Sequence, residues 1–100
     1  MASEAADDLK KRLFEFRQEA TYTPPDDDDL QNHLFRRLED NRRQVIPWLD
    51  AARPLQGAAV LEIGCGTGSA TVTLAEQGAQ VTAIDIDPRA IAVAERRCQL

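Results

Sequence analysis

Cysteine, histidine and lysine are scarce in this 100-residue chain, and each shortage argues against a class of function. The two cysteines, Cys65 and Cys98, stand 33 positions apart without a CxxC pair, and there is a single histidine, which argues against a zinc site. So low a cysteine content also favours a reducing compartment, and we expect a cytoplasmic protein. With only two lysines and a formal net charge of −5, the chain is a poor candidate for binding the phosphate backbone of nucleic acid.

Long apolar runs are missing as well. The longest uncharged stretch near the N-terminus is far too short to span a membrane, and the first ten residues are acidic where a targeting segment would be basic. Hydrophobic residues make up 43% of the chain and charged residues 29%, a balance typical of a globular rather than a disordered protein. The length allows one domain. We therefore expect a small soluble domain with no membrane partner.

The composition changes near Gly57. Residues 1–57 hold 21 of the 29 charged residues and all five aromatic residues, whereas residues 58–100 hold eight charges and four of the five glycines. This distribution predicts a helical lead-in over residues 1–57 and a separate glycine-containing unit over residues 58–100.

Two helices are predicted in the lead-in. Leu9, Leu13 and Phe16 recur at helical spacing within residues 3–20, and the Pro24–Pro25 pair ends that helix. The acidic run at 26–29 supplies N-cap candidates for the second helix and has no partners that would make it a metal site. The apolar stripe of the second helix consists of Leu30, Leu34, Leu38, Val45, Ile46 and Leu49.

Three further features of the second helix can be predicted. Pro47 should interrupt or restart it, because proline lacks the N–H that a helix interior needs. His33 is expected on its surface. The arginines at 36, 37, 42 and 43 alternate with Glu39 and Asp40, which predicts a solvated, salt-bridged face rather than a nucleic-acid interface.

After Gly57 the pattern becomes strand, turn, helix, strand, helix. Residues 58–63 are short, apolar and partly β-branched, which is typical of a parallel strand buried on both faces. A helix is predicted over 69–77, ended by Gly78, and a second strand over 81–86. Asp87 and Pro88 are typical of a helix start, so the last helix should cover 89–100. The result is a βαβα unit with parallel strands.

The segment from Glu62 to Gly68 is the motif that carries chemistry. Glycines at 64, 66 and 68 permit a tight turn and let a ligand approach without meeting a Cβ atom. The helix that follows presents free N–H groups to an anionic group. Asp85, 17 residues after Gly68, ends the second strand, where a carboxylate can bind both hydroxyls of a ribose. Because a carboxylate is costly to bury, we expect Glu62 at the mouth of this ligand site, facing a cationic group.

Other glycine motifs fit less well. A nicotinamide or flavin fingerprint, GxGxxG, would need glycine or alanine where Ser69 stands. A phosphate-binding Walker loop would need a lysine, and there is none after Lys11. The remaining pattern is an acid, GxGxG, and a second acid at the end of the next strand.

That pattern resembles the class I S-adenosylmethionine-dependent methyltransferases over about Val60 to Gln99. The resemblance implies a Rossmann-like, doubly wound α/β sheet and methyl transfer from S-adenosylmethionine. It also implies cofactor-binding roles for Glu62, Gly64, Cys65, Gly66, Gly68, Asp85 and Ile86. In the family, the GxGxG turn lies under the methionine end of the cofactor, the second acid binds the ribose, and the following residue packs against the adenine. Glu62 matches the acid near the cofactor's amino group.

Several simpler interpretations stand beside this one. The three glycines could form a tight turn in any doubly wound fold, and Asp87 is better explained as a helix cap than as a ligand. Cys65 fits a small turn residue better than a nucleophile, because no histidine is near it in the sequence. The lead-in helices could cover the cofactor and shape an acceptor pocket, which is a role that only the resemblance implies.

The resemblance implies seven strands, of which two are expected here. The strand Val60–Ile63 should pair with another strand on each of its edges, but a two-stranded parallel sheet supplies only one such partner. We expect either a methyltransferase front end that lacks its C-terminal segment, or a non-enzymatic remnant or binding module that completes its sheet through a partner. A fragment of an NAD(P)-binding oxidoreductase is a further alternative. A small-molecule acceptor is expected, and no residue can be nominated as a catalytic base.

Overall fold

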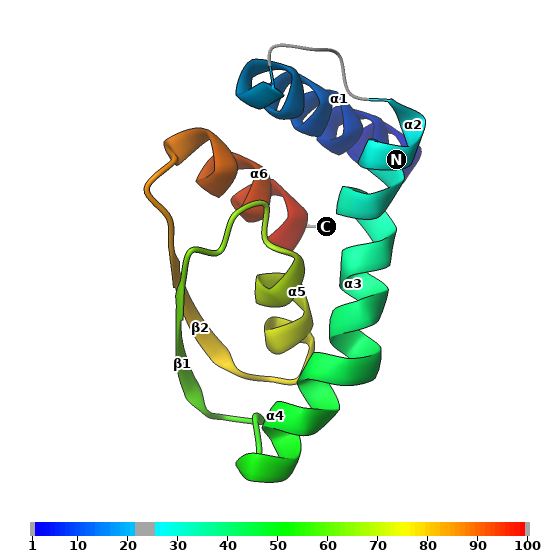
Figure 1. Ribbon diagram of the computed structural model, residues 1–100. Coiled ribbons are helices and arrows are strands. Elements are labelled where there is room, and N and C mark those ends of the chain that lie inside the picture. Colours follow the sequence, from blue (N-terminus) through cyan, green and yellow to red (C-terminus); the bar gives the residue numbers. More distant parts are fainter. Residues whose placement is uncertain (1, 22–25, 100) are drawn as a thin grey trace.

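The computed structural model describes residues 2–21 and 26–99. The lead-in begins with helix α1 (Ala2–Thr21), which crosses one end of the molecule (Figure 1). A nearly continuous helical rod follows and runs down one side. Its segments are α2 (Asp27–Gln31), the π-helical turn η1 (Asn32–Arg36), α3 (Arg37–Asp40), the π-helical turn η2 (Asn41–Val45) and α4 (Ile46–Ala52). The predicted break at Pro24 and Pro25 lies outside the described residues.

The rod starts and changes geometry where its sequence requires. The Asp26 carboxylate accepts a hydrogen bond from the Asp29 N–H (2.8 Å), so the predicted N-cap is confirmed. Pro47 is the second residue of α4 and cannot donate to the Arg43 carbonyl. The preceding turn is accordingly π-helical, with the Ile46 N–H bonded to the Asn41 carbonyl. The restart at Pro47 is therefore confirmed as a change of helical geometry within an unbroken rod.

Two side chains of the rod differ from the prediction. His33 was expected on the surface, but it is 5% exposed. It lies three residues after Leu30 and beside Leu34, so it shares the face that packs on α1. Val45 was expected in the apolar stripe, but it is 41% exposed. The π-helical turn that contains Val45 changes the angular spacing of the side chains and turns it outward.

The second part forms the predicted βαβα unit. It consists of β1 (Ala59–Ile63), α5 (Ser69–Glu76), β2 (Gln80–Ile84) and α6 (Pro88–Cys98). The strands are parallel, with Val60 opposite Val81 and Ile63 opposite Ile84, so the α/β class and the strand direction are confirmed. Strand β2 ends at Ile84 rather than at 86, because its partner strand ends at Ile63. The Asp87 carboxylate accepts from the Arg89 N–H (2.9 Å) and caps α6.

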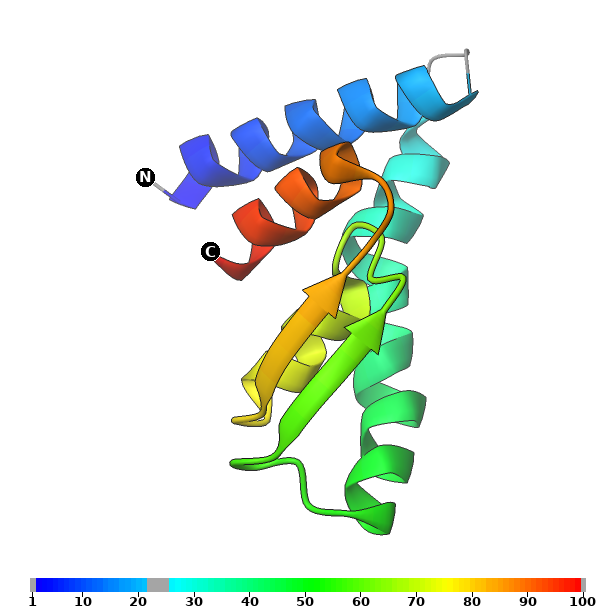
Figure 2. The same ribbon diagram turned by 90° about the vertical axis from the view of Figure 1, so that its left-hand side faces the viewer.

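The strand pair is covered on one face only. On the covered face, Val60 and Val81 pack against buried residues that include Leu74 of α5. On the other face, Leu61, Ile63 and Ile84 are 63%, 76% and 46% exposed. Figure 2 shows the strands in front of α5, with no element of the described chain lying over them. The prediction that the first strand is buried on both faces is therefore wrong for this strand pair. A single crossover helix can cover only one side of a sheet.

Two hydrophobic clusters hold the molecule together. Leu9 and Leu13 of α1 and Leu30 of α2 pack with Val93 of α6 in the first cluster. The second cluster consists of Ile46 of α4, Leu55 of the segment between α4 and β1, and Leu74 of α5. Both clusters join side chains from before and after Gly57. Among residues 2–21 and 26–99, no helix has the length and apolar character needed to cross a membrane.

The charged face of the rod is salt-bridged as predicted. Arg42 pairs with Glu39 on its own helix and with Glu76 of α5, and Arg36 pairs with Asp28. These carboxylates neutralise the arginines across a solvated surface. The described residues contain no group of three or more histidine, cysteine or acidic side chains that could hold a metal ion.

Candidate functional site

The turn between β1 and α5 is held against the end of β2. The N–H groups of Gly64 and Cys65 both donate to the Ile84 carbonyl, at 2.8 and 3.0 Å. Gly64, Gly66 and Gly68 have φ angles of 76°, 55° and 90°, which L residues with a Cβ rarely adopt. The sequence therefore folds here into a rigid turn that stands at the carboxyl ends of both parallel strands.

The three glycines serve two different purposes. A Cβ atom at Gly64 or Gly66 would meet nothing within 4 Å, so the backbone there faces open space that a ligand could fill. A Cβ atom at Gly68 would lie 2.8 Å from the Cβ of Ala94. Gly68 thus allows α6 to pack closely against the start of α5, while the two earlier glycines leave the turn accessible.

Asp85 binds the turn directly. One of its carboxylate oxygens accepts from the Gly66 N–H (2.9 Å), and the other accepts from the Asp87 N–H (2.9 Å). A carboxylate has about four lone-pair sites, so each oxygen keeps room for another donor such as a ribose hydroxyl. Two backbone hydrogen bonds therefore orient the Asp85 carboxylate. These two bonds were not predicted from the sequence.

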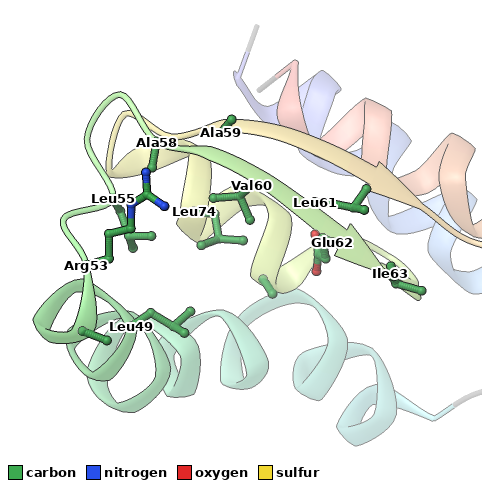
Figure 3. Close-up of a pocket in the computed structure, with 12 residues that line it drawn as sticks. Leu49, Arg53, Leu55, Ala58, Ala59, Val60, Leu61, Glu62, Ile63 and Leu74 are labelled. Carbon is green, nitrogen blue, oxygen red and sulfur yellow. The ribbon is translucent and has the colours of Figure 1, made fainter.

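Glu62 of β1 is hydrogen-bonded by a residue of α5. The Thr71 hydroxyl, in the first turn of α5, donates to the Glu62 carboxylate (2.5 Å). Sequence reasoning missed Thr71, although a polar residue three positions after the last glycine of the turn was a usable signal. The carboxylate also borders a hollow of about 540 Å³ between β1, α4 and α5. Figure 3 shows Glu62 among largely apolar lining residues such as Leu49, Val60 and Leu74.

Cys65 lies within the glycine turn, where its N–H donates to the Ile84 carbonyl. Its side chain is buried, and burial, followed by the negative charges of Glu62 and Asp85, raises the pKa of the thiol. A raised pKa keeps the sulfur protonated and weakly nucleophilic, as expected of a small turn residue. Ile86 is fully exposed just beyond Asp85 in the sequence.

Arg97 is the second site residue that sequence reasoning missed. One guanidinium nitrogen, Nη1, donates to the Thr67 carbonyl and to the Ser69 hydroxyl, each at 3.1 Å, and Nη2 donates to the Leu34 carbonyl at 3.4 Å. The side chain is 7% exposed, and burial lowers the pKa of the guanidinium. A signal existed, because Arg97 continues the buried stripe of Ala90, Val93 and Ala94 on α6.

Comparisons with known proteins agree with this geometry. Residues 60–100 match the family described as a methyltransferase domain. The chain is 39% identical over 67 residues to a ubiquinone biosynthesis O-methyltransferase of Paracidovorax citrulli, a match that covers 67% of this chain and 28% of that protein. It is 40% identical over 53 residues to a cypemycin N-terminal methyltransferase of a Streptomyces species, covering 53% and 22% of the two chains.

A third relative is a demethylmenaquinone methyltransferase of Tropheryma whipplei, which is 51% identical over 43 residues, covering 43% of this chain and 18% of the relative. This chain therefore spans less than a third of the length of each relative. No solved structure matches the chain significantly. The family match begins at Val60 and includes the turn, both carboxylates and α6. Over residues 60–100, the βαβα unit therefore resembles part of a class I S-adenosylmethionine-dependent methyltransferase domain.

Proposed function

We propose that this chain supplies the S-adenosylmethionine-binding part of a methyltransferase that acts on a small-molecule acceptor. The observation that carries the proposal is an open glycine turn next to two carboxylates: Glu62 in the strand before the turn and Asp85, which accepts from the Gly66 N–H. The cofactor offers an ammonium and a sulfonium, which carboxylates attract, and a ribose diol, which a carboxylate can bind bidentately. S-adenosylmethionine supplies the electrophilic methyl group when it is bound.

Each residue of the turn has a distinct part in this proposal. Gly64, Cys65, Gly66 and Gly68 form the backbone surface under the amino-acid end of the cofactor. Asp85 accepts from the ribose hydroxyls, and its bonds to the Gly66 and Asp87 N–H groups hold it in place. Ile86 packs against the adenine. Glu62, oriented by Thr71, faces the amino group.

The acceptor class is supported by the relatives and by the charge of the chain. Two of the three relatives carry quinone names, ubiquinone and demethylmenaquinone, which are small molecules. The net charge of −5 does not favour nucleic acid. In the proposal the protein works in the cytoplasm. A further strand, supplied by more of the chain or by a partner, would pair with the free edge of β1 beside the hollow in Figure 3.

Calorimetric titration with S-adenosylhomocysteine tests the proposal. Asp85→Asn should weaken binding by about tenfold or more, because hydrogen bonds to a charged group contribute about 1.5–3 kcal/mol. Asp87→Asn is the matched control: it removes the same charge two residues away and keeps a good N-cap, so affinity should stay within about twofold.

Equal losses in the two variants would contradict the role of Asp85. Binding of NADH in place of S-adenosylhomocysteine would support the oxidoreductase alternative and overturn the proposal. Binding of S-adenosylhomocysteine without methyl transfer to any quinone-like acceptor would favour a binding module over an enzyme.

A further inference from the structure

Arg97 is a buried cation beside the glycine turn. It contacts three acceptors, the carbonyls of Thr67 and Leu34 and the hydroxyl of Ser69, and all three are electrically neutral. Its side chain is 7% exposed. It therefore ties the turn to the lead-in rod through Leu34, and its positive charge is removed from water.

No carboxylate within the described residues pairs with Arg97. The neighbouring Arg96, by contrast, is paired with Asp8. Removing a charge from water costs free energy, and hydrogen bonds to neutral acceptors offset only part of that cost. The same desolvation strengthens its attraction for an anion placed nearby, because the interior screens charges less than water does. The turn therefore carries an uncompensated positive charge on its Thr67–Ser69 side.

The charges around the turn form an asymmetric pattern. Glu62 and Asp85 supply negative charge at the strand ends, while Arg97 adds to the positive end of the α5 dipole at Ser69. The amino-acid end of the proposed cofactor carries one carboxylate and one ammonium. A ligand with those two charges has only one favourable orientation across such a pattern.

We infer that Arg97 is a positioning residue that directs the carboxylate of the cofactor's amino-acid end toward the Thr67–Ser69 side of the turn, leaving the ammonium toward Glu62. This inference rests on the proposed function and adds to it the origin of the cofactor's orientation. Arg97 acts through its hydrogen bonds to the Thr67 carbonyl and the Ser69 hydroxyl.

Two probes separate this role from a general structural one. The first is S-adenosylhomocysteine, and the second is its decarboxylated analogue, 5′-(3-aminopropylthio)-5′-deoxyadenosine, which keeps the ammonium and the ribose. Wild-type protein should bind S-adenosylhomocysteine at least about tenfold more tightly than the analogue, as expected for a carboxylate held by a poorly screened cation. This first measurement needs no variant, so it stands even where a substitution at Arg97 prevents folding.

Three variants then locate the effect. Arg97→Gln keeps N–H donors but removes the charge, and it should reduce the preference for S-adenosylhomocysteine about tenfold while leaving affinity for the analogue within about twofold. Arg97→Lys keeps the charge and should retain most of the preference. Arg96→Gln is the matched control, since that arginine binds Asp8 and not the turn, and it should leave the preference unchanged.

Equal wild-type affinity for the two probes would overturn the inference while leaving the proposed function intact. Equal loss of both probes in Arg97→Gln would also overturn it, because that result would mean that Arg97 only shapes the turn. Failure of the wild-type protein to bind either probe would contradict the proposed function itself, and the inference with it.

Discussion

At the scale of single residues, His33 and Arg97 show how a polar side chain on an apolar helical stripe becomes buried. His33 lies three residues after Leu30, and Arg97 lies three residues after Ala94. In each case helical spacing carries the side chain into the interior with its apolar neighbours. His33 Nδ1 has no hydrogen-bond partner in the described structure, and Arg97 reaches only neutral acceptors. Both residues retain polar groups at an energetic cost.

The His33 environment predicts a pH dependence of folding. Burial, followed by the positive charges of Arg37 and Arg17, lowers the pKa of His33, whereas Asp29 opposes the change and Arg97 adds to it. The folded state therefore binds a proton less readily than the unfolded state. Stability should be constant above the unfolded pKa of about 6.5 and should fall progressively as the pH drops from there through the folded pKa.

Urea unfolding between pH 7 and pH 5 measures this slope. His33 is the only histidine in the chain, and carboxylates with lowered pKa values, such as Asp29, act at lower pH, so His33→Gln should flatten the slope in this range. An unchanged slope in His33→Gln would contradict the burial of a neutral imidazole.

At the scale of elements, strand β1 has two unequal faces. Val60 packs against the cluster of Ile46, Leu55 and Leu74, whereas Ile63 on the opposite face is 76% exposed. Both side chains are β-branched and belong to the same strand, so they share the same backbone preference. Any difference between them in stability must therefore come from burial.

Replacing each residue by threonine, which is also β-branched, tests this difference. Val60→Thr places a hydroxyl against an apolar cluster and should lower the free energy of unfolding by about 1–3 kcal/mol. Ile63→Thr should change it by less than about 0.5 kcal/mol, as is usual for exposed positions. Equal costs in urea denaturation would mean that the outer face of β1 is covered in solution, and repeating the measurement at tenfold lower protein concentration would reveal a second copy as the cover.

At the scale of the whole molecule, the lead-in and the βαβα unit share their cores. Figures 1 and 2 both show α1 and α6 side by side, and the first cluster joins Leu13 of α1 to Val93 of α6. The second cluster joins Ile46 of α4 to Leu74 of α5. Since each part buries apolar surface of the other, we expect the chain to unfold in a single transition.

Truncation of Leu13 tests this coupling. Leu13 is completely buried, so Leu13→Ala should lower the free energy of unfolding by about 2–5 kcal/mol through lost burial and the cavity left behind. Hydrogen exchange should then accelerate in α6 as well as in α1. Loss of protection confined to α1 would show that the lead-in unfolds independently of the βαβα unit.

Much of this structure could be predicted from local chemistry. The glycine turn, the N-caps Asp26 and Asp87 and the effect of Pro47 all depend on backbone preferences or contacts within a few residues. The parallel direction of the two strands follows from the helix that connects them. The acid-x-GxGxG pattern with its later acid likewise led to the family that residues 60–100 match. The ligand contacts of the seven predicted site residues stay predictions, and the titration of Asp85→Asn tests that of Asp85.

Only the tertiary structure decided which polar groups meet across the fold. The bond from Thr71 to Glu62 needs α5 folded back on β1, and the contact of Arg97 with Thr67 joins residues 30 positions apart. The exposed face of β1 and the buried position of His33 also depend on which elements pack against them. Hydrophobic pattern and turn chemistry act over a few residues and therefore specify elements, whereas burial and the environment of a charge depend on neighbours that only the assembled chain supplies.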